Sequence, residues 1–134
     1  MLTIRLVCPG QPVSAKNHQA ATLARGKGGR LVPVVRPGKA ITSWYDRVVP
    51  VLARQFAQYQ VPALSGPLHI TVHQVLENDP LAVGSPDGDN VQSGVWDALQ
   101  KAGVIENDRQ FVAWAGTRTH GEPHVLIEIR RLAA

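Results

Sequence analysis

The chain has 134 residues, of which 44% are hydrophobic and 18% charged, and its formal net charge is +4. This length suits one domain with a single core, and this composition excludes a wholly disordered chain. No apolar run approaches the roughly 18 residues that span a bilayer, and no charged-then-apolar leader opens the chain, so we expect a soluble protein that is not exported.

Charge is distributed unevenly along the chain. Residues 1–60 contain nine basic side chains and one acid, whereas residues 61–134 contain nine acids and five basic side chains. A polycationic segment folded against an acidic site is typical of a protein that holds a polyanion by its phosphates while a metal acts on one of them. A solvated basic surface without a partner is the competing interpretation.

The first apolar stretch predicts a strand over residues 2–8, and we expect its single cysteine, Cys8, to be a buried thiol. Residues 13–30 lack apolar periodicity and carry a Gly-Lys-Gly-Gly run at 26–29, whose spacing is wrong for a phosphate-binding loop. A connection of this length indicates a flexible basic arm.

A short edge strand is predicted over residues 31–35, followed by a helix over residues 39–59. The helix has apolar side chains at helical spacing, among them Trp44 and Phe56, which we expect in the core. Pro50 interrupts this pattern and predicts a kink or a division into two pieces.

Alternation of apolar and polar residues predicts a strand over residues 67–76. His69 and His73 share its less apolar face. Because no cysteine or third histidine is spaced to complete a zinc site, we interpret both as sheet-face histidines.

Acidic residues flank a short amphipathic helix predicted over residues 90–102: Asp87 and Asp89 precede it, and Asp108 follows it. Carboxylate oxygens are the ligands that Mg²⁺ prefers, so we expect the three to form a magnesium site, with Mn²⁺ as a substitute. Such an ion polarises a phosphate and activates an attacking water. Asp89 and Gln92 also have the pattern of a helix capping box, which requires no catalysis.

Residues 111–119 and 124–130 are strand-like, and the Gly-Glu-Pro between them predicts a hairpin. The resulting element order favours an α+β fold, in which a small mixed sheet packs against two main helices.

Three motifs in the acidic region resemble the signature of the RusA family of Holliday junction resolvases. Members of that family typically read D-x-D-N-L-x-K, then D-A-L-x-x-A-G, then D-D. The corresponding residues here are Asp87-x-Asp89-Asn90, Asp97-Ala98-Leu99-x-x-Ala102-Gly103 and Asn107-Asp108.

The resemblance implies a single RusA-like domain over residues 1–134 that forms a homodimer. It implies Mg²⁺-dependent phosphodiester hydrolysis that places paired nicks in a four-way DNA junction, in recombination and repair. The family's metal aspartates correspond to Asp87, Asp89 and Asp108, which would be the catalytic acids. A cytoplasmic, nucleoid-associated protein of a bacterium or phage follows from this resemblance.

Two positions depart from the family pattern: Asn107 stands where members often have another aspartate, and, more importantly, Ser93 stands where members have a catalytic lysine. A lysine there would stabilise charge in the transition state, whereas serine donates only a hydrogen bond. Either another cation replaces it, Lys16 first and Lys101 second, or the protein is a branched-DNA-binding homologue with weak or lost nuclease activity.

The basic first part of the chain would hold the junction arms by their phosphates, so recognition should follow the shape of the junction more than its sequence. The predicted DNA-binding residues are Lys16, Asn17, Arg25, Lys27, Arg30, Arg36 and Lys39.

Overall fold

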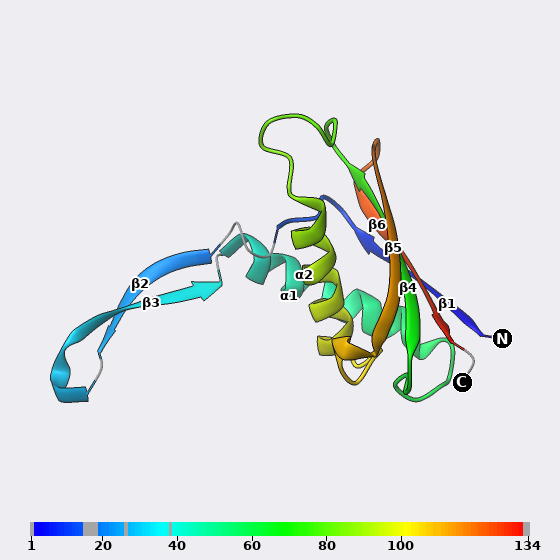
Figure 1. Cartoon of the computed structure of the whole chain (residues 1–134), viewed down its shortest axis with the longest axis horizontal. Coiled ribbons are helices and arrows are strands. Elements are labelled where there is room, and N and C mark those ends of the chain that lie inside the picture. The colour runs from blue at the N-terminus through cyan, green and yellow to red at the C-terminus, as the bar shows by residue number, and fades with distance from the viewer. Residues whose placement is uncertain (1, 15–18, 26, 38, 133–134) are drawn as a thin grey trace.

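A four-stranded mixed sheet and two helices form the body of the protein (Figure 1). The computed structural model describes residues 2–14, 19–25, 27–37 and 39–132. Its elements are β1 (Thr3–Pro9), β2 (Gln19–Arg25), the 3₁₀ turn η1 (Lys27–Gly29), β3 (Leu31–Pro37), α1 (Lys39–Ala57), β4 (Leu68–Leu76), α2 (Gly88–Lys101), the 3₁₀ turn η2 (Asp108–Gln110), β5 (Phe111–His120) and β6 (His124–Arg131). The predicted α+β class is confirmed.

The strand order of the sheet is β1-β6-β4-β5, with β4 and β5 parallel and the other neighbours antiparallel. The predicted hairpin of residues 111–119 and 124–130 is therefore wrong, because β4 lies between β5 and β6. The connection crosses the end of β4, where the Gly121 amide donates to the Leu76 carbonyl at 2.8 Å. A short connection with Gly and Pro predicts a reversal of direction, but it does not require the two strands to be neighbours.

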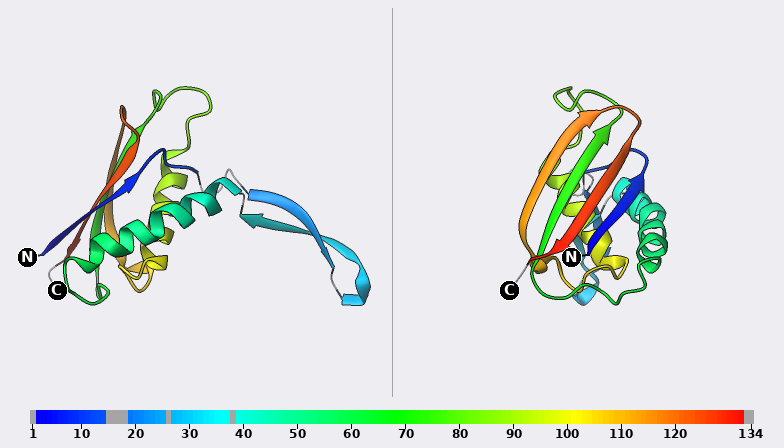
Figure 2. Two further views of the ribbon diagram at one scale, coloured as in Figure 1. Left: turned by 180° about the vertical axis from the view of Figure 1, so that it is seen from behind. Right: turned by 90° about the vertical axis from the view of Figure 1, so that its right-hand side faces the viewer.

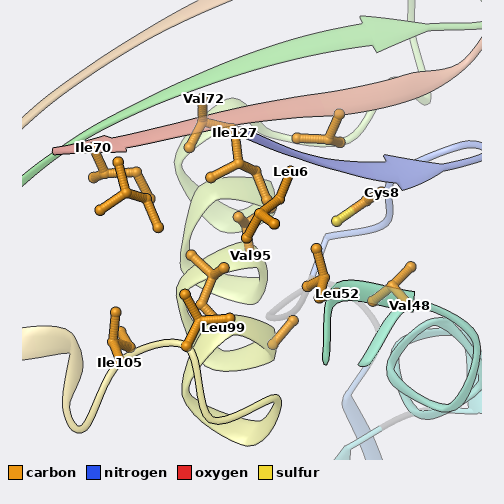
Figure 3. Packing of buried hydrophobic residues seen from close by; sticks show 14 of the residues in the cluster. Leu6, Cys8, Val48, Leu52, Ile70, Val72, Val95, Leu99, Ile105 and Ile127 are labelled. Atoms are coloured by element: carbon orange, nitrogen blue, oxygen red, sulfur yellow. The ribbon is translucent and has the colours of Figure 1, made fainter. Parts of the chain in front are cut away.

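Both helices cover one face of the sheet (Figure 2). Alternation places Leu68, Ile70, Val72 and Leu76 of β4 on that face, where each is 0% exposed. Figure 3 shows the core between the sheet and the helices, with side chains from β1, β4, β6, α1 and α2 meeting there. Cys8, Trp44 and Phe56 are buried in it as predicted.

Helix α1 covers the outer edge of β1 with two polar side chains. Gln55 pairs with the Val7 backbone, accepting from its amide at 2.8 Å and donating to its carbonyl at 3.0 Å. The Tyr59 hydroxyl does the same for Arg5, at 2.9 and 3.2 Å. Backbone groups that would otherwise form an open strand edge are therefore satisfied within the chain.

Helix α1 continues through Pro50 without division into two pieces. Pro50 is exposed, and the carbonyl one turn earlier, on Asp46, belongs to an exposed residue as well. Water can satisfy that carbonyl, so the proline costs less than it would in a buried helix.

Strands β2 and β3 form a two-stranded antiparallel ribbon that projects away from the body (Figure 1). Residues 19–25 are therefore a strand, and the prediction of an irregular loop there is wrong. At the start of the predicted arm, Val13 packs against the core and Ser14 is 1% exposed. Residues 15–18 lie outside the described residues. Among the residues that are described, no helix is long and apolar enough to cross a membrane.

Candidate active site

Helix α2 lies along β5 with matched spacing, so that every fourth helical residue meets every second strand residue. Trp96 packs on Trp114 with ring centroids 5.6 Å apart. One turn earlier, a β-carbon on Gly116 would lie 3.5 Å from the Gln92 Oε1. Because four helical residues rise about 6 Å and two strand residues about 6.6 Å, the match holds over the length of α2.

Members of this contact row and residues next to them line an open groove of about 340 Å³ beside α2 and β5. Two of the predicted acids, Asp89 and Asp108, are among the lining residues, together with Gln92, Ser93, Trp96 and Trp114. Asp89 and Ser93 lie four residues apart on α2, which places them on one side of the helix. Trp114 is 59% exposed at the other wall.

Asp108 reaches the groove because the chain folds back after α2. Its turn η2 is capped by Asn107, whose side chain accepts from the Arg109 amide at 2.9 Å, while Gln110 Oε1 accepts from the Asn107 amide at 2.9 Å. Gln110 also donates to the Leu64 carbonyl at 2.8 Å, which ties the turn to the loop before β4. In the Asn107-Asp108 motif, Asn107 therefore stabilises the turn, and Asp108 supplies the acidic side chain.

Asp87 occupies the N-cap position of α2, with extended backbone angles of φ −65° and ψ 133°. Its side chain makes no capping hydrogen bond and instead accepts from the Asn90 side-chain amide at 3.3 Å. The predicted capping box of Asp89 is wrong, because the helix begins at Gly88 and Asp89 lies inside its first turn. An acid there still interacts favourably with the helix dipole.

The three predicted acids are thus placed differently. Asp89 and Asp108 line one groove, and Asp87 lies two residues before Asp89, outside the lining residues. In the part of the chain that the structure describes, no three His, Cys, Asp or Glu side chains form a group able to hold a metal ion. Oxygen donors that face an open groove nevertheless suit Mg²⁺, which takes one or two protein carboxylates and fills its shell with water and phosphate.

Comparison with known proteins identifies the family of the chain. A family model described as Endodeoxyribonuclease RusA matches residues 9–130. The chain belongs to the RusA family. A crossover junction endodeoxyribonuclease RusA of Aquifex aeolicus (strain VF5) is 30% identical over 132 residues, which cover 97% of this chain and 93% of that protein. The resemblance seen in the sequence motifs is confirmed, and the chain is a member of a nuclease family.

Ser93, which the sequence motif aligns with the family lysine, lines the same groove as Asp89 and Asp108. Of the two cations expected to replace that lysine, Lys101 is in the wrong place. Its Nζ lies 5.2 Å from the centre of the Tyr45 ring, and it is roughly 18 Å along the helix axis from Asp89, at 1.5 Å per residue. Lys16 lies outside the described residues.

Tyr45 connects α1 to this end of α2. Its hydroxyl donates to the Asp97 Oδ2 at 3.1 Å, and burial, together with the neighbouring Asp97 carboxylate, raises the pKa of the phenol. Asp97 and Lys101 therefore take part in helix packing, away from the RusA groove.

The predicted DNA-binding residues of the RusA chain are spread over the ribbon and the start of α1. Arg30 is exposed between η1 and β3, and Lys39 is exposed in the first turn of α1. The backbone positions of Arg25, Lys27 and Arg36 belong to the ribbon. Lys16 and Asn17 fall outside the described residues.

Two sheet residues that contact the start of α2 were not predicted from the sequence. Gln74 on β4 and Arg118 on β5 are register partners, and both contact the segment that carries Asp87 and Asp89. Gln74 did leave a signal, because it interrupts the apolar row of its strand. Arg118 left none, since its neighbours depend on β5 lying beside β4.

Proposed function

We propose that this chain is a Mg²⁺-dependent, structure-selective endonuclease that resolves four-way DNA junctions by paired phosphodiester hydrolysis. The observation that carries the proposal is the shared groove of Asp89 and Asp108, at the positions of the family's acidic motifs. Membership of the RusA family and the name of the Aquifex relative supply the reaction and the branched substrate.

In this proposal, Asp89 and Asp108, which line the same groove, bind the metal ion, and Asp87 acts with them. A bound Mg²⁺ would polarise the scissile phosphate and lower the pKa of an attacking water. The groove is open, so it admits both a DNA backbone and the waters that complete the ion's shell. Ser93 donates a hydrogen bond toward the phosphate where the family has a positive charge.

Two matched nicks in a two-fold-symmetric junction require two such grooves, which a homodimer provides. Arg30, exposed between η1 and β3, and Lys39, exposed in the first turn of α1, would hold the junction arms through their phosphates. A protein with one groove per junction would release singly nicked products instead.

The decisive experiment is a nicking assay on a synthetic four-way junction with Mg²⁺, with a linear duplex of the same arm sequences as the control substrate. Wild type should nick opposed strands of the junction and leave the duplex intact. Asp89→Asn and Asp108→Asn should each lower the rate by about 100-fold or more, as expected when charge stabilisation at the reacting phosphate is removed. Glu122→Gln, an exposed carboxylate in the β5–β6 connection, is the matched control and should retain the wild-type rate.

A second function is favoured by the position of Ser93 in the groove: junction binding with weak or lost cleavage. Tight junction binding without nicks by wild type, with nicks restored by Ser93→Lys, would support it. If wild type neither binds nor cleaves the junction, both functions are contradicted.

A further inference from the structure

The helix-facing row of β4 contains a single polar side chain. Gln74 is 4% exposed, between Val72 and Leu76, which are both 0% exposed. Both ends of its amide are hydrogen-bonded: Nε2 donates to the Gly88 carbonyl at 3.0 Å, and Oε1 accepts from the Arg118 Nε at 3.3 Å. A buried amide left without partners would destabilise the fold, so these bonds explain how the sheet tolerates Gln74.

Arg118 is the register partner of Gln74 on β5 and extends the same network. Its Nη2 donates to the Pro86 carbonyl, and its aliphatic stem packs on Gly88, where a β-carbon would lie 3.0 Å from the Arg118 Cδ. The carbonyl groups on either side of Asp87 are therefore bound by two side chains that also bind each other.

This pair fixes the part of the chain where precise placement matters most. Helix ends fray, and metal-binding or catalytic groups must be held to within roughly 0.5 Å of their working geometry. Asp87 and Asp89 lie at the first turn of α2, and their segment follows the exposed loop of residues 77–84. The hydrogen bonds to the sheet add to the packing of Asn90 and Val91, which are 7% and 1% exposed.

We propose that Gln74 and Arg118 act together as positioning residues for the acidic segment, holding Asp87 and Asp89 in the orientation that metal and phosphate require. This inference rests on the proposed nuclease function. Two sheet residues that are not among the lining residues of the groove would then affect the chemical step through the acids whose segment they hold.

The test uses Gln74→Leu, Arg118→Met and the double variant in the full-length protein. Each single variant should lower the single-turnover nicking rate by about 10- to 100-fold, the usual effect of losing a residue that orients a metal ligand. The Kd for the junction should change by less than about 2-fold, because the DNA-holding residues lie elsewhere. The double variant should be no slower than the slower single variant, since both remove one shared network.

Two further measurements separate positioning from a general loss of structure. Hydrogen exchange of the amides of residues 88–92 should accelerate in both single variants, while exchange in the β1–β6 pair stays unchanged. Mn²⁺ binding to the DNA-free protein, followed by the electron spin resonance of free Mn²⁺, should weaken by about 10-fold or more. Arg118→Lys keeps one donor and should recover part of the rate.

Thr117→Val is the control, because Thr117 is the adjacent β5 residue and bonds His73 Nδ1 at 2.6 Å on the opposite face. It should leave nicking, exchange and Mn²⁺ binding at wild-type values. Independent, additive effects of the two single variants, or unchanged exchange at residues 88–92, would overturn the joint positioning function. If wild type does not nick junctions, the nuclease proposal fails, whereas exchange and Mn²⁺ binding still decide whether Gln74 and Arg118 hold the acidic segment.

Discussion

Gly88 and Arg118 are in such close contact that a β-carbon on Gly88 would lie 3.0 Å from the arginine Cδ and 3.3 Å from its Nε. The first residue of α2 is therefore packed directly on the stem of an arginine from β5. Arg118 also donates to the Pro86 carbonyl, so it contacts the residues immediately before and after Asp87. A glycine in the D-x-D motif thus allows the helix and the sheet to approach each other.

Gly88→Ala should lower the nicking rate without lowering the stability of α2. Alanine favours a helix over glycine by up to about 1 kcal/mol, so the helix itself is not weakened. The added methyl group displaces Arg118 from the Pro86 carbonyl, and we expect nicking to fall about 10-fold, as for other residues that orient a metal ligand. Nicking rate and thermal unfolding together check this outcome.

Gln100→Ala, at an exposed position of the same helix, is the control for helix propensity alone. Full nicking activity in Gly88→Ala would show that the Arg118 contact does not matter for the acids.

Ser93→Lys should raise the nicking rate by about 10-fold or more, because it places a positive charge in the groove that Asp89 and Asp108 also line. Ser93 is exposed, so the free energy of unfolding should change by no more than about 0.5 kcal/mol. Gln100→Lys adds the same charge at an exposed site of α2 outside the groove and should have no such effect. A rate unchanged by Ser93→Lys would mean that another cation already serves this step.

Arg30→Ala and Lys39→Ala should each weaken junction binding and lower the slope of log K against log salt concentration by about 1. The effect should be similar for junctions of different sequence, since phosphate contacts carry no base information. Binding titrations at several salt concentrations measure it. Arg54→Ala removes the same charge from the last turn of α1 and should leave the slope at the wild-type value.

Cys8 should be inert in the folded protein. Burial raises the pKa of its thiol from 9.0 to about 12, against a smaller lowering by Arg47. The reactive thiolate is therefore nearly absent at pH 8, and reaction with a disulfide reagent should be slow until denaturant unfolds the chain. A rapid reaction of the native protein would contradict the burial of Cys8.

The same shift has a consequence for stability. The unfolded thiol ionises near pH 9 and the folded one near pH 12, so the contribution of Cys8 is complete below pH 9 and is lost as the pH rises toward 12. Thermal unfolding of wild type and Cys8→Ala at pH 8 and pH 10.5 checks the sign, because only wild type should lose this part of its stability.

Local pattern in the sequence predicted much of the molecule. The alternation in residues 67–76 and the helical spacing of residues 90–102 are confirmed as β4 and α2. The acids next to α2 were recognised because their spacing matches a family motif. The edge strand predicted over residues 31–35 is confirmed as part of β3, but β2 and its pairing with β3 were missed, because residues 19–25 lack the alternation that burial of one face produces.

The sequence by itself predicted the acidic residues Asp87, Asp89 and Asp108 as the site and showed that Ser93 departs from the family pattern. Tertiary structure alone decided that β5 lies beside β4 rather than β6, and hence that Arg118 and Trp114 face α2. Strand pairing joins residues more than 40 positions apart, and any two strands offer the same backbone donors and acceptors. Only burial of whole side-chain faces against the helices selects one pairing. That pairing brings Gln74 and Arg118 together at the segment that carries Asp87 and Asp89.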